Sequence, residues 1–399
     1  MDPVKRTVTL LSLCQAVFNT GQAMLMLTAG LVGYQMLGEN PTLATMPIST
    51  MVVGTAMATI PASLLMGRFG RRNGFTIGNG IAFLGAAIAA LGVSIGGMPG
   101  FAAFCVATFC LGSANGFAQH YRLAAADVAK GDFKPKAISY VLAGGVVAAF
   151  VGPEIVVRTV DMIPETRFLG TFFALIGVQF VSLALIRTLD LPRPTAAELR
   201  ETPRPLGEIA RQPTFIVACL SSMIGFSLMS LLMTATPIAM VEQFHHALDD
   251  TKTVIQWHAF AMFFPSFFTG AIIARFGVVN VILAGIVFMV GSVGFAATDT
   301  NVLHFWMAMF LLGLGWNFMF VGGSTLLTES YRVSERPKAQ AFHDFAVFGL
   351  VALSSLSSGA LLQFLSWQAV SLGAIPFLVV VTLAVVWLAW RRRAAPSPA

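Results

Sequence analysis

The segment Gly67-Arg68-Phe69-Gly70 recurs 207 residues later as Ala274-Arg275-Phe276-Gly277. A second segment, Lys134-Pro135-Lys136-Ala137, recurs 202 residues later as Arg336-Pro337-Lys338-Ala339. Two offsets that agree to within a loop insertion are typical of a duplicated structural unit. We therefore expect the chain to fold as two related halves.

Long apolar stretches flank every copy of these segments. The 399-residue chain is 56% hydrophobic and 11% charged, whereas charged residues make up about a quarter of a soluble domain. Stretches of about 20 apolar residues can cross a bilayer as helices, and a helix satisfies its own backbone amides, as hydrocarbon requires. This composition leaves no room for a soluble enzyme domain. We predict an all-α membrane protein, not an enzyme, with twelve transmembrane helices at residues 8–37, 44–66, 74–95, 99–121, 137–157, 168–189, 214–240, 251–274, 278–297, 302–326, 339–365 and 367–390.

One long polar connection divides the predicted helices into two sets of six. It runs from Leu191 to Gln212 and is rich in proline and mixed charges. We predict an N-terminal six-helix bundle at 1–190, a cytoplasmic inter-bundle loop at 191–212, a C-terminal six-helix bundle at 213–393 and a tail at 394–399. Two pseudo-symmetric bundles around a midplane site are the architecture of a transporter.

The distribution of Lys and Arg predicts the orientation. If both termini face the cytoplasm, 21 of the 24 Lys and Arg residues lie on the cytoplasmic side, and Arg158, Arg167 and Lys252 lie on the other. This asymmetry is the one that sets membrane topology. The net charge of +6 then follows from topology and does not indicate nucleic-acid binding. We expect the lipid bilayer as a partner, and no nucleic acid.

The loop after the second predicted helix carries a family signature. Met66-Gly67-Arg68-Phe69-Gly70-Arg71-Arg72 resembles the loop of the major facilitator superfamily, in which an acidic residue, a basic residue, a glycine and a basic pair sit between helices 2 and 3. The chain departs from that pattern at Gly67, where the family has its acidic residue. The resemblance covers the whole chain in length, helix count and duplication. It implies the major facilitator fold, transport by alternating access, and a role in conformational exchange for Arg68, Gly70, Arg71 and Arg72.

Ionisable residues inside predicted spans are candidates for the substrate pathway. They include His120 at the end of the fourth span, Glu154 in the fifth, and His343 and Asp344 in the eleventh. Such groups are costly in hydrocarbon and mark function more often than structure. The alternative is that residues near span ends, such as Arg122, anchor the helix at the interface.

A set of methionines and a histidine in the seventh and eighth spans favours a soft metal. Met229 and Met233 are four residues apart, as are His258 and Met262, so each pair shares one helix face. Met233 and His258 lie about 10 Å below the predicted outer ends of their helices, and Met229 and Met262 about 16 Å. Thioethers and a neutral imidazole favour Cu(I) over Zn(II), Mg(II) or Ca(II). Methionine is also an ordinary filler of apolar cores, so the spacing alone leaves both interpretations open.

A narrower resemblance concerns this same set. Met-x-x-x-Met followed by His-x-x-x-Met is similar to the signature of bacterial copper importers within the superfamily, which supply haem-copper oxidase assembly. It implies copper import across the bacterial inner membrane through Met229, Met233, His258 and Met262, with copper as substrate and no cofactor. Two alternatives stay open: a permease for an organic solute such as riboflavin or a drug-like molecule, and a receptor that binds a ligand without transporting it.

Overall fold

The computed structural model of the chain describes residues 2–37, 43, 46–191 and 203–394. Half of the predicted inter-bundle loop, at 192–202, and nearly all of the predicted tail lie outside these residues. The side chain of Lys252 is likewise not among those described.

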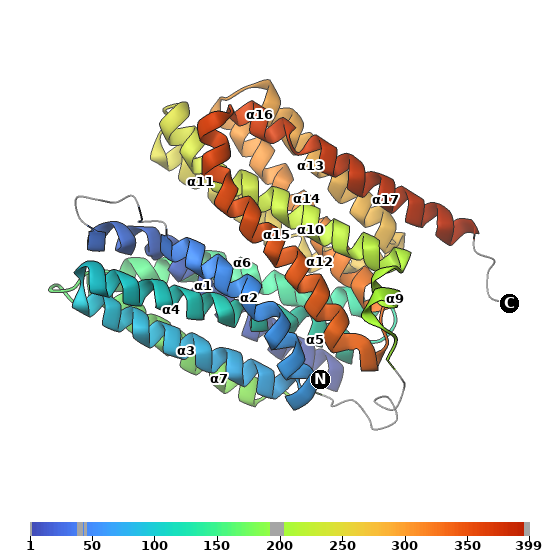
Figure 1. The fold of residues 1–399 in the computed structure, drawn as a ribbon, viewed down its shortest axis with the longest axis horizontal. Helices are drawn as coiled ribbons and strands as arrows, with labels where there is room; N and C mark the ends of the chain where they lie inside the picture. The colour runs from blue at the N-terminus through green and yellow to red at the C-terminus, as the bar shows by residue number, and fades with distance from the viewer. Residues whose placement is uncertain (1, 38–42, 44–45, 192–202, 395–399) are drawn as a thin grey trace. The chain divides into compact units, whose positions relative to one another are not determined.

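Every regular element in the described part of the chain is helical, as predicted for the fold class (Figure 1). Eleven helical segments are long and apolar enough to span a membrane, or twelve if one bent pair counts as a single span. Several of these spans are built from two consecutive elements. The elements are α1 (Pro3–Leu37), α2 (Met46–Phe69), α3 (Arg71–Ile95), α4 (Gly97–Ala118), α5 (His120–Val128), α6 (Phe133–Thr159), α7 (Leu169–Arg187), α9 (Leu206–Ala210), α10 (Pro213–Ile238), η2 (Ala239–Gln243), α11 (Leu248–Phe263), α12 (Ser266–Phe276), α13 (Val278–Thr298), α14 (Val302–Glu329), η3 (Val333–Glu335), α15 (Arg336–Phe364), α16 (Trp367–Leu372) and α17 (Ile375–Ala394).

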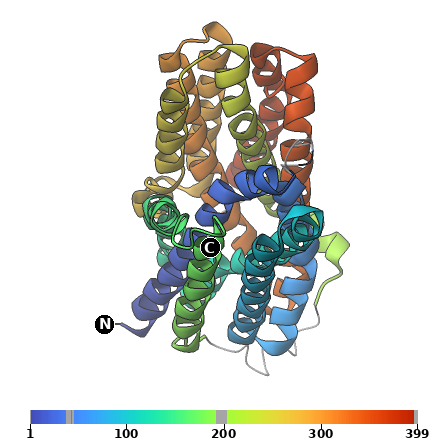
Figure 2. The ribbon, with the colours of Figure 1, turned by 90° about the vertical axis from the view of Figure 1, so that its left-hand side faces the viewer.

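The described residues group into two compact units. Unit 1 comprises Met1–Ala129, Tyr140–Thr195 and Gln340–Gly349, and unit 2 comprises Lys130–Ser139, Ala196–Ala339 and Leu350–Ala399. In unit 1, α4 packs between α2 and α3, and α3 also packs against α7 (Figures 1 and 2). In unit 2, α14 is the central helix and packs against α10, α11 and α13. The domain boundaries and the cytoplasmic placement of both termini stay predictions.

The predicted eighth span is bent rather than straight. Its two parts, α11 and α12, meet at an angle of 42°, next to Pro265, which has no N–H to give to the preceding turn. Asn317 on α14 bridges the break. Its amide nitrogen donates to the Met262 carbonyl at 2.7 Å and to Ser266 Oγ at 2.5 Å, and its oxygen accepts from Thr269 Oγ1 at 2.7 Å. A neighbouring helix thus satisfies backbone groups that a broken span would leave unpaired.

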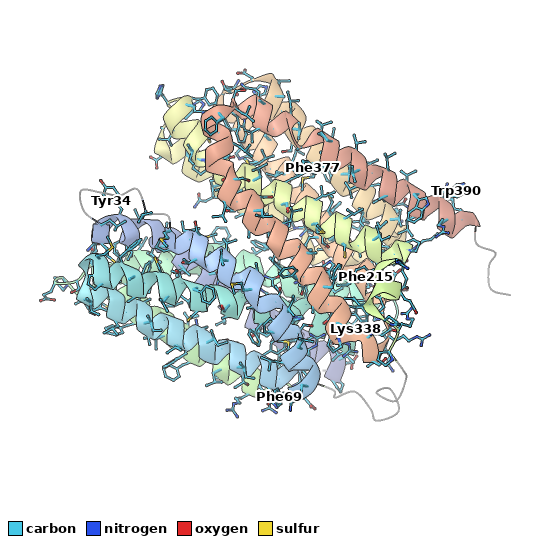
Figure 3. All side chains as sticks on the ribbon, viewed as in Figure 1. Tyr34, Phe69, Phe215, Lys338, Phe377 and Trp390 are labelled. Atoms are coloured by element: carbon cyan, nitrogen blue, oxygen red, sulfur yellow. The ribbon has the colours of Figure 1, made fainter. Side chains whose placement is uncertain are left out.

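The duplicated turns share one backbone geometry. Gly70 has φ 85° and ψ 158°, and Gly277 has φ 84° and ψ 149°. This region of φ and ψ is adopted almost exclusively by glycine. Arg68 and Arg275 each lie 5.3 Å from the centroid of the phenylalanine ring that follows them, and Figure 3 labels the first of these rings, Phe69, at the end of α2. The repeated sequence therefore produces a repeated structure.

Large apolar side chains cover the outside of the helices. Phe377 and Trp390, labelled on α17 in Figure 3, are 54% and 67% exposed. Leu91 in α3, Phe173 in α7 and Leu353 in α15 are also mostly exposed. So many exposed apolar side chains would be a liability in water, and they are expected of helices that face lipid.

Candidate functional site

Three of the four predicted pathway residues meet in one buried cluster of unit 1. Oδ1 of Asp344 lies 2.9 Å from Nδ1 of His343 and 3.1 Å from an Arg122 guanidinium nitrogen. Nε2 of His120 lies 4.0 Å from Oδ2 of Asp344. All four side chains are buried. Residues of α5 and of the Gln340–Gly349 segment of α15, more than 200 positions apart, therefore form one cluster.

Arg122 takes part in this cluster as an ion-pair partner rather than as an anchor at the surface. Its side chain is 1% exposed, so a lone charge there would carry a large desolvation cost, which the Asp344 carboxylate offsets. This burial argues against an interfacial anchor, and the role of this region in the substrate pathway stays a prediction.

Several polar atoms of the cluster have no hydrogen-bond partner among the described residues. They are both ring nitrogens of His120, Nε2 of His343 and Oδ2 of Asp344. Buried polar groups in folded proteins are nearly always hydrogen-bonded. These four atoms therefore stand out as exceptions within the described part of the chain.

Glu154, the fourth predicted pathway residue, lies away from this cluster. Its side chain on α6 is 57% exposed and forms an ion pair with Arg158, one helical turn later, at 2.6 Å. Such exposed pairs contribute little to stability.

The predicted conformational loop is tied to α5. Two nitrogens of Arg71 donate to Oδ2 of Asp127 at 2.9 and 2.8 Å, and one of them also donates to Oε1 of Gln340 at 2.9 Å. Arg72 donates to the Arg187 carbonyl at 2.5 Å. Asp127 thus supplies the carboxylate that Arg71 binds, and Gly67, which stands at the acidic position of the family pattern, supplies none.

The predicted metal-site residues lie in unit 2, around α14. Nδ1 of His258 lies 2.7 Å from the Met309 carbonyl, so Nδ1 carries the proton and Nε2 presents a lone pair. That Nε2 is buried and has no partner among the described residues. Met229 and Met262 are buried, and Met233 is half-buried.

The two helices that carry this set pack mainly against α14. α10 and α11 each contact α14 along much of their length and contact each other only slightly. The matched depths predicted from sequence assumed two directly adjacent helices. The convergence of Met229, Met233, His258 and Met262 on one ion therefore stays a prediction.

The sequence patterns did not predict a group of aromatic residues that gathers around Trp316 on α14. Trp316 stacks on Phe320 with centroids 5.2 Å apart and meets Phe226 of α10 and Phe263 of α11 edge-on at 5.4 and 5.8 Å. Trp316 is 2% exposed, and its indole Nε1 has no partner in the described part of the chain. The sequence did carry a signal for this group. Tryptophan in membrane helices favours the interfaces, whereas Trp316 lies in the middle of its span, which is unusual.

Comparison with known proteins identifies the family. The profile described as Major Facilitator Superfamily matches residues 11–235 and 218–399. A protein named riboflavin transporter RfnT, from Brucella anthropi, is 38% identical over 384 residues, which cover 96% of this chain and 95% of that protein. The human organic anion transporter MFSD10 has a similar structure, with a TM-score of 0.76, 13% identity, and coverage of 96% of this chain and 100% of its own.

A structure of a bacterial homologue of the iron transporter ferroportin is also similar, with a TM-score of 0.72, 11% identity, and coverage of 95% and 98%. At such low identity these likenesses show the fold alone, and the fold is shared by proteins named for organic and for metal substrates. The relative named as a riboflavin transporter does not support the narrower resemblance to copper importers, and it agrees with the organic-solute alternative. The multi-helix membrane fold, the family profile and this relative lead to one assignment: the chain belongs to the major facilitator superfamily of secondary transporters.

Proposed function

We propose that the protein is a permease of the bacterial inner membrane for an uncharged, flat organic solute of the riboflavin type. The observation that carries this proposal is the 38% identity, over 96% of the chain, to the Brucella anthropi protein named as a riboflavin transporter. Identity at this level extends through both halves of the chain, so it includes the helices that line any pathway.

The interior chemistry of unit 2 supports an uncharged solute. Among the described side chains of α10, α11 and α14, no Asp, Glu, Lys or Arg is buried. The buried polar groups there are hydroxyls, an amide, an imidazole and an indole. A charged solute would lack a counter-ion in such an environment, and its desolvation would be costly.

Two unpaired groups at the packing face of α14 match the hydrogen-bonding pattern of a flavin ring. Among the described residues, no partner meets the indole N–H donor of Trp316 or the Nε2 acceptor of His258. A flavin ring offers both carbonyl acceptors and an N–H donor. Met309, whose carbonyl holds His258, and Trp316 are seven residues apart on α14, which places them on one face about 10 Å apart. The rings around Trp316 add surfaces suited to stacking against a planar solute.

Copper import is the second candidate, and one observation favours it. A metal-binding histidine usually donates its other ring N–H to a carbonyl or carboxylate, and His258 does so to Met309. Met229 and Met262 are buried on the two helices that flank α14. An uptake experiment separates the riboflavin and copper candidates.

The test is uptake by the purified protein reconstituted in lipid vesicles, with riboflavin and Cu(I) supplied separately. We expect riboflavin to enter the vesicles and Cu(I) to stay outside them. Trp316→Phe, which keeps a ring and removes the N–H donor, should lower riboflavin uptake about tenfold, the cost of one lost hydrogen bond to a buried partner. Trp306→Phe is the matched control, because it makes the same change on the same helix outside the Trp316 cluster.

Two results would reject the proposal, and a third would move the solute site away from Trp316. Cu(I) uptake that requires Met229, Met233, His258 and Met262, without riboflavin uptake, would establish the copper hypothesis. Riboflavin binding without flux would make the protein a receptor. Equal uptake by the Trp316→Phe and Trp306→Phe variants would leave the solute correct and place its site elsewhere.

A further inference from the structure

We propose that five carboxamide side chains of unit 1 form a surface that binds the hydroxylated chain of the transported solute. They are Gln15, Asn19 and Gln22 of α1, Asn115 of α4, and Gln119 at the C-terminal cap of α4. We call this set the carboxamide face. The inference rests on the proposed transport of a riboflavin-type solute. Such a solute joins a flat ring to a flexible chain of hydroxyl groups, and the groups named so far in unit 2 suit the ring.

The first support is that α1 has two different sides. Gln15, Asn19 and Gln22 follow one another at spacings of four and three residues, so they share one helix face. Leu13 and Leu31, which are 47% and 56% exposed, lie on the opposite face. Exposed leucines suit lipid, whereas half-buried carboxamides such as Asn19 and Gln22 would lack polar partners in hydrocarbon. The carboxamide side of α1 therefore faces a polar space.

The second support is that the set continues onto α4, which packs against α1. Nε2 of Gln22 lies 3.5 Å from the carbonyl oxygen of Leu111 on α4. Asn115 lies one helical turn after Leu111, and Gln119 lies one turn after Asn115. Both of these amides are half-buried, like those of α1. The five carboxamides thus form one set on two packed helices.

The third support is the hydrogen-bonding capacity that remains on the α1 side chains. Nε2 of Gln15 donates to Oδ1 of Asn19 at 2.8 Å. Among the described residues, nothing pairs with Nδ2 of Asn19 or with the side-chain oxygens of Gln15 and Gln22. A carboxamide offers both N–H donors and a carbonyl acceptor, and a hydroxyl group both donates and accepts. A row of such amides can therefore pair with successive hydroxyl groups of a flexible chain.

Helix packing does not account for this set. Carboxamides in membrane helices commonly hydrogen-bond from one helix to another. Here the bond from Gln15 to Asn19 stays within α1, and the bond from Gln119 to Asn115 stays within one stretch of chain, at 2.8 and 3.0 Å. The bonds of this set that cross between helices are longer, at 3.4 and 3.5 Å. The shorter bonds orient the amides and leave the helices without strong amide links.

The experiment compares uptake of riboflavin with uptake of lumiflavin, which has the same ring system and a methyl group in place of the hydroxylated chain. Vesicles contain the full-length protein. We expect the wild type to have a KM for riboflavin about tenfold below its KM for lumiflavin, because the hydroxyl groups add hydrogen bonds. The double variant Asn19→Leu/Gln22→Met replaces two amides by apolar side chains of similar size. It should raise the KM for riboflavin about tenfold and leave the KM for lumiflavin unchanged.

The matched control is Asn280→Leu, which removes an exposed carboxamide at the start of α13 in unit 2, where it donates to the Phe276 carbonyl. It should keep the wild-type preference for riboflavin. The single variant Asn19→Leu provides the same comparison if the double variant fails to fold. The inference is overturned if the amide variants change the KM of both flavins equally, or of neither.

A second measurement covers the case in which neither flavin enters the vesicles, which rejects the proposed function. Asn19→Cys and Leu13→Cys are treated in vesicles with a charged thiol reagent on both sides of the membrane, and the wild type, with its four native cysteines, gives the background. Thiol reagents attack the thiolate, which forms readily only in contact with water. We expect Asn19→Cys to react at least tenfold faster than Leu13→Cys, and this result would keep the carboxamide face as a wet solute surface even if the solute is not a flavin. Equal rates would mean that this side of α1 faces no polar space, and they would overturn the inference.

Discussion

Unit 1 buries a cluster of charged side chains around Arg122 and Asp344, whereas α10, α11 and α14 of unit 2 bury sulfur, aromatic rings and uncharged polar groups. Glu335, a buried carboxylate of unit 2, lies outside those three helices and pairs with Arg204. The contrast is clear at positions related by the 202-residue offset. Asp127 in unit 1 binds the largely buried Arg71, while Glu329 in unit 2 is 43% exposed and binds Arg392. The two halves thus share the turns at Gly70 and Gly277 but differ in interior chemistry. Among the described residues, the buried ion-pair cluster of His120, Arg122, His343 and Asp344 therefore lies in unit 1, and Trp316 and His258 lie in unit 2.

The largest expected effect tests whether the buried charges of unit 1 are required for its structure. Asp344→Ala leaves Arg122 as a buried charge without its partner, which should cost about 3–5 kcal/mol. Glu329→Ala removes the exposed carboxylate and should cost less than about 1 kcal/mol. Thermal unfolding of the two purified variants in detergent measures the difference. Equal losses of stability would remove the distinction between the two units.

The second prediction concerns the glycine turns at Gly70 and Gly277, which the two halves share. Gly70→Ala and Gly277→Ala place a side chain in a backbone region that only glycine adopts readily, at a cost of about 1–3 kcal/mol each. Nothing lies within 4 Å of an added Cβ at either position, so the cost comes from φ alone and should be equal in the two units. Thermal unfolding of both variants, with Gly80→Ala on α3 as a helical control that also has open space, checks this. Unequal losses would show that the two turns are no longer equivalent.

The sequence predicts features that have a local signal better than features that depend on how the helices pack. Helix positions followed from apolar length, and the shared turns followed from the repeated segments, because both signals are local. The faces of the helices were harder to predict. A span that is apolar all round carries no periodic signal for its buried side, so Glu154 and Asp344 looked alike in sequence.

The central place of α14 could not be predicted from local signals either. It depends on which helices pack together, and Trp316 and Asn317 became visible as partners of α10, α11 and α12 only in three dimensions. Pro265 is a local signal for the bend, which the predicted straight span at 251–274 did not use, and nothing local shows that Asn317 bridges the break. The sequence alone therefore favoured the spaced methionines over the aromatic cluster.

The third prediction compares two asparagines that are 202 residues apart. Asn317 makes three short hydrogen bonds across the break between α11 and α12, whereas Asn115 donates to Thr55 at 3.4 Å and accepts from Gln119 at 3.0 Å. Asn317→Ala should cost about 1–3 kcal/mol because it leaves buried partners unsatisfied. Asn115→Ala should cost less, since its site is only partly buried. Thermal unfolding ranks the two, and the reverse order would mean that the break does not depend on its bridge.

The smallest expected effect concerns Glu154, which the sequence placed in the substrate pathway together with Asp344. Its carboxylate is mostly exposed and its partner Arg158 is 75% exposed, so neither charge loses much hydration and the pair contributes little. Glu154→Gln keeps the size of the side chain and should change riboflavin uptake less than twofold. Asp344→Asn, the same chemical change in the buried cluster, should reduce riboflavin uptake at least tenfold, because the amide cannot balance the charge of Arg122. Both are measured in the same vesicles, with the protein content of each preparation matched. If Glu154→Gln abolishes uptake while Asp344→Asn does not, the pathway runs along α6 and the buried cluster of unit 1 is structural.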